Sequence, residues 1–129
     1  MDNQYTCAVA VVKDGDRYLL GLSTSNDDRR NKWAMPGGHI KRGEDVKKAA
    51  ARECKEETGI TAIPKSQDVF EVPGKKGVAF VVLKPSTSRS SHDLKPNSEF
   101  VALGFFTKAE MQSLDLYKTV EPAIKKANK

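Results

Sequence analysis

One run of helix-forming residues lies in the middle of the chain, with short β-type segments on both sides of it. The run, residues 44–58, follows Gly43 and is closed by Gly59, the residue type most often found just past a helix end. Glu44 and Asp45 open the run, and the dipole of a helix favours negative charge at that end. We therefore predict one central helix over 44–58 in a fold of mixed α and β type.

The strands are predicted from short apolar runs that lie between turn residues. Residues 5–12 and 17–22 should form a hairpin around the turn Asp14-Gly15-Asp16. Further strands are expected within 60–72, notably at 69–72, and at 78–83 and 99–106. Surface loops are expected at 23–32 and 84–98, followed by a short helix capped by Thr107 and a helix at 115–127. Pro122 requires that this last helix begin just before it. We see no repeat and expect one domain over residues 1–129.

Composition narrows the class of protein. The net charge of +5 favours polyanionic ligands such as nucleotides, RNA ends or nucleic acid, although a merely soluble surface would give the same sum. No apolar run approaches the roughly 20 residues that cross a bilayer, so no membrane partner is expected. The first residues show no secretory signal, so we expect a cytoplasmic protein whose Cys7 and Cys54 are free thiols.

Three glutamates share one stripe of the central helix. Successive helical residues are about 100° apart, so Glu56 lies roughly 60° to one side of Glu53 and Glu57 roughly 40° to the other. Small apolar residues, among them Ala49 and Ala50, continue the same stripe, and no lysine of the helix lies among the acids. Like charges at this spacing repel. A divalent cation that prefers oxygen ligands, Mg²⁺ or Mn²⁺, would neutralise them, whereas the alternative is a solvated acidic patch.

These residues and their spacing resemble the Nudix box. That motif is Gly, five residues, Glu, seven residues, Arg-Glu, an aliphatic residue, any residue, Glu-Glu, any residue, Gly and an aliphatic residue. The chain reads Gly38-HIKRG-Glu44-DVKKAAA-Arg52-Glu53-Cys54-Lys55-Glu56-Glu57-Thr58-Gly59-Ile60. Its one departure is Cys54, which behaves as a small hydrophobic residue. The lead-in from Trp33 to Gly38 is also similar to this family.

The resemblance implies a fold, a reaction and a set of site residues. The fold would be a mixed central sheet in an α/β/α sandwich, with the box as loop, helix and loop. The reaction would be hydrolysis of a nucleoside diphosphate linked to another moiety, with Mg²⁺ or Mn²⁺. The implied metal ligands are Glu53, Glu56, Glu57 and the carbonyl group of Gly37.

The resemblance leaves the general base open between Glu53 and a later acid, for which Glu99 is the candidate. Arg52 would orient the base, and Glu44 would pair with Arg52 and lock the geometry. The alternative for Glu99 is a solvated residue at a strand edge.

The substrate is less constrained than the reaction. We expect a (d)NTP pyrophosphohydrolase of MutT type, with 5′-triphosphate RNA, nucleotide sugars and dinucleoside polyphosphates as alternatives, and a non-catalytic nucleotide-binding module as a different class. Gly38, His39 and Trp33 are candidates for substrate contact. The alternatives are that Trp33 packs in the core, as strand aromatics more often do, and that His39 makes a local hydrogen bond in its loop. Whether the chain is a monomer or a homodimer is not decided by the sequence.

Overall fold

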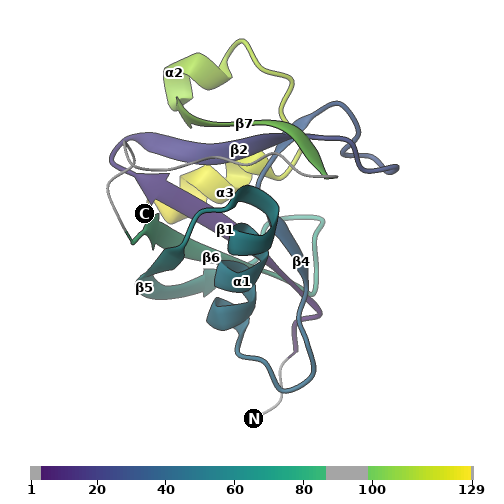
Figure 1. The fold of residues 1–129 in the computed structure, drawn as a ribbon, viewed down its shortest axis with the longest axis vertical. Coiled ribbons are helices and arrows are strands. Elements are labelled where there is room, and N and C mark those ends of the chain that lie inside the picture. Colours follow the sequence, from purple (N-terminus) through teal and green to yellow (C-terminus); the bar gives the residue numbers. More distant parts are fainter. Residues whose placement is uncertain (1–3, 87–98, 129) are drawn as a thin grey trace.

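The strands of the described chain form one mixed sheet (Figure 1). The computed structural model describes residues 4–86 and 99–128. Within these segments the sheet has seven strands. The strands are β1 (Cys7–Asp14), β2 (Arg17–Ser23), β3 (Trp33–Ala34), β4 (Gly37–His39), β5 (Ala62–Phe70), β6 (Val78–Pro85) and β7 (Phe100–Thr107). The helices are α1 (Val46–Thr58), α2 (Lys108–Met111) and α3 (Val120–Ala127).

Strand β1 lies at the centre of the sheet and separates two apolar layers. It pairs antiparallel with β2 and β4 and parallel with β6. Because successive strand residues face opposite sides, Ala8, Ala10 and Val12 pack with the residues under α1, whereas Val11 packs in the layer that contains α3. The two helices therefore cover opposite faces of the sheet (Figure 1), which confirms the predicted α/β/α sandwich.

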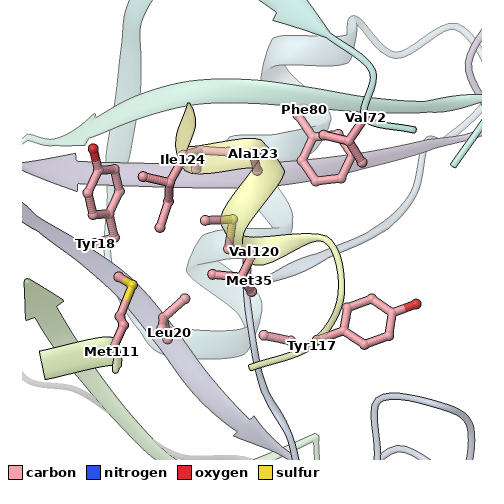
Figure 2. Close-up of a cluster of buried hydrophobic side chains, with 12 residues drawn as sticks. Tyr18, Leu20, Met35, Val72, Phe80, Met111, Tyr117, Val120, Ala123 and Ile124 are labelled. Carbon is pink, nitrogen blue, oxygen red and sulfur yellow. The ribbon is translucent and has the colours of Figure 1, made fainter. Parts of the chain in front are cut away.

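The layer between the sheet and α3 is shown in Figure 2. Tyr18 and Leu20 of β2 contact this layer from the sheet, and Val120, Ala123 and Ile124 contact it from α3. Tyr117 lies at the edge of the layer, and its hydroxyl group points away from the other labelled side chains (Figure 2). One side of Tyr117 is thus fixed by the core while its polar end faces out of it.

The central helix begins two residues later than predicted. Asp45 is its N-cap, because its carboxylate accepts hydrogen bonds from the backbone N–H groups of Lys47 and Lys48. Glu44 therefore lies in the loop before the helix. Gly59 ends the helix with a φ of 82°, a left-handed conformation that suits glycine, as predicted.

The predicted helix over 115–127 is wrong in its first part. Trp33 N–H donates to the carbonyl of Asp115 at 2.8 Å, and Tyr117 N–H donates to the carbonyl of Trp33 at 2.9 Å. These two hydrogen bonds form an isolated β-bridge between Leu116 and Trp33 of β3. Because the backbone there is extended, α3 begins only at Val120. Pro122 then lies in the first turn, where its missing N–H group costs nothing, which confirms that part of the prediction.

The other predicted elements are found with shifted bounds. The hairpin, the turn after residue 72 and the strand at 78–83 are confirmed, and Thr107 forms the expected capping box with Glu110. The strand predicted within 60–72 is β5, which runs from Ala62 to Phe70 with an irregular register between Pro64 and Val69, so that residues 71 and 72 lie beyond it. Most of the loop predicted at 84–98 lies outside the described residues. No helix in the described segments is long and apolar enough to span a membrane.

Candidate active site

A cleft of about 640 Å³ brings the box residues together with distant parts of the chain. Its volume is in the range of small-molecule sites. The residues that line the cleft are Cys7, Val9, Asp27, Asp28, Arg29, Ala34, Met35, Gly37, Gly38, His39, Lys41, Arg52, Glu53, Glu57, Lys75, Val78, Phe80, Glu99, Tyr117 and Thr119. We call Glu53, Glu57 and Glu99 the acidic cluster.

Two consecutive glycines allow α1 to approach β4 closely. A Cβ atom on Gly37 would lie 2.7 Å from the carbonyl oxygen of Ala8, on the neighbouring strand β1. A Cβ atom on Gly38 would lie 2.5 Å from Oε2 of Glu53. Strand β4 can therefore pair with β1 and still have a carboxylate against its backbone only because both positions lack a side chain.

Glu57 is a buried acid beside another acid. Its exposed fraction is 4%, and its Oε1 accepts a hydrogen bond from Gly37 N–H at 3.2 Å. Burial above all, and then the hydrogen bond to Glu53 and the charges of Glu99 and Glu53, raise the pKa of Glu57 to about 9. Without a cation, Glu57 therefore holds a proton at neutral pH.

Arg52 fixes the neighbouring carboxylates. Its Nε and Nη2 donate to the two oxygens of Glu44 at 2.8 and 3.0 Å, in a fork that confirms the predicted pair. Its Nη1 donates to Oε2 of Glu53 at 3.1 Å, and Nη2 also donates to the carbonyl of His39 at 3.1 Å. The bond from Arg52 lowers the pKa of Glu44 to about 2. Arg52 thus ties the box loop to the carboxylate that lies over Gly38.

Glu56 is placed differently from the other two box glutamates. Its side chain is 54% exposed, contacts Arg52 Nη1 at 3.3 Å and does not line the cleft. Within the described residues, no three His, Cys, Asp or Glu side chains form a ready metal-binding group. The stripe predicted for the helix is therefore present in the backbone, but the Glu56 carboxylate is turned toward Arg52.

The donor set of the acidic cluster nevertheless fits a divalent cation. The raised pKa of Glu57 keeps a proton on this carboxyl group beside Glu53, its hydrogen-bond partner, and the charge of Glu99 acts on Glu57 as well. A hard cation such as Mg²⁺ takes carboxylate oxygens and can replace that proton. The residues present therefore fit the metal that the box implies.

The remaining predicted residues divide between the cleft and the core. Glu99 lines the cleft, and its carbonyl oxygen accepts a hydrogen bond from Thr24 N–H at 2.8 Å. His39 also lines the cleft, and its side chain is exposed. Trp33 does not line it: the ring packs edge-on against Phe106 at 5.1 Å. For Trp33 the structure favours the core alternative over contact with substrate.

Sequence reasoning missed the cleft residues that lie outside the box. They come from the 24–32 loop, the turn after β5 and the segment before α3, and they are Asp27, Asp28, Arg29, Lys75, Tyr117 and Thr119. The paired charges of the loop were visible as a surface feature, but Tyr117 was assigned to a helix. Only the tertiary contacts of β3 bring Tyr117 beside the cleft.

Comparison with known proteins gives consistent matches. Residues 3–127 match the NUDIX domain family. An ADP-ribose pyrophosphatase of Methanocaldococcus jannaschii is 39% identical over 67 residues, which are 49% of this chain and 38% of that protein. An RNA pyrophosphohydrolase of Bartonella clarridgeiae is 43% identical over 58 residues, 43% of this chain and 34% of that protein. The chain thus matches well under half the length of these relatives.

The solved structure of a MutT protein from Methanosarcina mazei has a similar fold. Its TM-score is 0.70 at 24% identity, with 99% of this chain and 96% of that chain covered. At this level of identity the likeness concerns the fold alone.

Proposed function

Because this chain belongs to the NUDIX family of hydrolases, we propose that it hydrolyses a phosphoanhydride bond in a nucleoside diphosphate linked to another moiety, with Mg²⁺ or Mn²⁺. The observation that carries the proposal is the buried carboxyl group of Glu57 on Gly37 N–H, next to Glu53 packed over Gly38, in a nucleotide-sized cleft. A buried acidic pair of this kind is costly without a cation, and it is placed where a ligand can reach it.

Each side chain has a separate task in this proposal. Glu53, Glu57 and Glu56 would hold the metal together with the carbonyl of Gly37, which requires Glu56 to turn away from Arg52. The bound cation would neutralise charge on the phosphates and favour ionisation of water. Glu53 would accept a proton from the attacking water, since Arg52 Nη1 already fixes its Oε2. Glu99, which also lines the cleft, is the second candidate for that base.

Our first choice of substrate is a (d)NTP, cleaved with release of pyrophosphate. The 5′ end of a triphosphorylated RNA is the second candidate, since the cleft carries Arg29, Lys41 and Lys75 and one relative is named an RNA pyrophosphohydrolase. A binding module without activity is disfavoured because each acid of the box is present in the chain. The proposed partner is thus a nucleotide or an RNA end.

The experiment is a panel of (d)NTPs, ADP-ribose, nucleotide sugars, dinucleoside polyphosphates and triphosphorylated RNA, with the products identified. With Mg²⁺ we expect a nucleoside monophosphate and pyrophosphate, and EDTA should abolish their release. Glu56→Gln and Glu57→Gln should each lower turnover at least about a hundredfold. Glu121→Gln, on the exposed side of α3, is the matched control and should keep full activity. Near-normal turnover in both box variants, or no hydrolysis of any compound, would contradict the proposal.

A further inference from the structure

A second group of charged side chains surrounds Tyr117, which lines the cleft. This residue is only 6% exposed, and its ring has the Lys75 Nζ at 5.2 Å on one flank and the Lys118 Nζ at 5.9 Å. Arg29 lines the same part of the cleft, and the charge of its guanidinium interacts with Tyr117. We call Arg29, Lys75 and Lys118 the basic cluster.

Two carboxylates lie among these three cations. Asp27 is bound by Arg29, whose Nη2 donates to Oδ2 at 2.8 Å. Asp28 has its own partners: the Lys118 ammonium lies 3.2 Å from Oδ2, and the Tyr117 hydroxyl donates to the same group at 3.2 Å. Each acid therefore already has a cation of its own, and the sum over the cluster is one positive charge.

Once Arg29 is paired with Asp27 and Lys118 with Asp28, the remaining positive charge of the basic cluster is that of Lys75. In the part of the chain that the structure describes, no carboxylate lies within ion-pair distance of its ammonium group. Asp27 and Asp28 feel its charge only at longer range. Its side chain is half-buried on the Tyr117 ring, whereas that of the next residue, Lys76, is exposed. An ammonium group that is held on an aromatic face inside a cleft is placed to bind an anion.

Arg29 and Lys75 of the basic cluster line the same cleft as the acidic cluster. Arg29 interacts electrostatically with Glu99, so the two groups adjoin. The 24–32 loop is also tied to Glu99, because both the N–H and the hydroxyl group of Thr24 donate to the Glu99 carbonyl, at 2.8 and 3.2 Å. A ligand whose anhydride lies at the acidic cluster therefore has Arg29 and Lys75 in the same cleft.

We propose that Lys75, with Arg29 beside it, binds a second phosphate group of the substrate, one that is not part of the scissile anhydride. This rests on the proposed function and narrows it to substrates with such a group. The phosphate could be the terminal one of a nucleoside triphosphate or the first phosphodiester of an RNA 5′ end. ADP-ribose and nucleotide sugars carry no charge at either place and would gain nothing from Lys75.

The test compares three compounds that share one nucleoside: the 5′-diphosphate, the 5′-triphosphate and the 5′-triphosphorylated dinucleotide. Values of kcat/KM are measured with Mg²⁺ for the unaltered chain, Lys75→Gln and Lys76→Gln. A charge-assisted contact of this kind corresponds to at least about a tenfold preference. We expect that preference in the unaltered chain and in Lys76→Gln, and its loss in Lys75→Gln. If kcat/KM rises from the diphosphate to the triphosphate, the phosphate that Lys75 binds is the terminal one. If kcat/KM rises from the triphosphate to the dinucleotide, it is the phosphodiester.

Three outcomes would overturn the inference. They are equal kcat/KM for all three compounds, a preference that Lys75→Gln retains, and an equal loss in Lys75→Gln for every compound, which would indicate contact with the nucleoside. If only ADP-ribose or nucleotide sugars are cleaved, the inference fails while the proposed function stands. If nothing is cleaved, the proposed function fails, and calorimetric dissociation constants for the same compounds and variants decide on Lys75.

Discussion

Glu57→Gln should make the metal-free protein more stable while it destroys activity. The pKa of Glu57 is about 9, against an ordinary 4.5, so at pH 7 the folded chain takes up a proton that the unfolded chain lacks. For each pH unit between 4.5 and 7, this proton uptake lowers the free energy of unfolding by about 1.4 kcal/mol. At pH 7 the loss of stability therefore amounts to about 3 kcal/mol. The residue is 4% exposed, so solvent screens little of this cost.

Glutamine avoids the cost without changing the contacts. It is neutral at every pH, its carbonyl can accept from Gly37 N–H, and its amide group can donate to Glu53. The raised pKa of Glu57 means that the unaltered chain keeps this share of its stability below pH 4.5 and loses it as the pH rises toward 9. The stability gap between the variant and the unaltered chain should therefore open over that interval.

Thermal and urea unfolding in EDTA at pH 4.5, 7 and 8.5 measure the gap. We expect none at pH 4.5 and an advantage for the variant of up to about 3 kcal/mol at pH 7, or about 10 °C in Tm for a domain of this size. Saturating Mg²⁺ should stabilise the unaltered chain and have little effect on the variant. A variant that is less stable at pH 7 and 8.5, or a gap that is independent of pH, would refute the reasoning.

Three further predictions concern residues around the cleft. Gly38→Ala should lower turnover at least about a hundredfold, because the new methyl group would displace the Glu53 carboxylate, and circular dichroism should show a retained fold. Arg52→Lys should also lower kcat, since an ammonium group cannot form the fork to Glu44 and reach Glu53 at once; unchanged kcat would contradict that role. Thr107→Ala should cost about 1 kcal/mol in urea unfolding with kcat unchanged, since it removes the cap of α2 far from the cleft.

Local patterns predicted the box region well because its determinants are near in sequence. The stop at Gly59 and the pairing of Arg52 with Glu44 depend on helix geometry and on residues within one loop and one helix. The start of α1 was missed by two residues because Asp45 competes with Glu44 for the N-cap, and the aspartate side chain reaches the N–H groups of Lys47 and Lys48.

The C-terminal segment shows where local patterns fail. Residues 115–119 have helical propensity, but Trp33 offers backbone hydrogen bonds to Asp115 and Tyr117, and these bonds join segments that are more than eighty positions apart. The same contacts hold Trp33 against Phe106 and bring Tyr117 beside the cleft. A single long-range pairing thus keeps Trp33 out of the cleft and brings Tyr117, which was not predicted there, to its wall.

The orientation of each side chain is also left open by helix geometry. The angular positions of Glu53, Glu56 and Glu57 were predictable, but Arg52 at i−4 draws Glu56 outward with a contact of 3.3 Å, whereas burial keeps Glu57 facing inward. A cation in the cleft would compete with Arg52 for Glu56. Because the Arg52–Glu56 contact involves a half-exposed carboxylate, it contributes at most about 1 kcal/mol, which a divalent ion readily exceeds. The outward position of Glu56 is therefore compatible with a metal-binding role, and the strong fork to Glu44 would keep Arg52 in place when Glu56 leaves it.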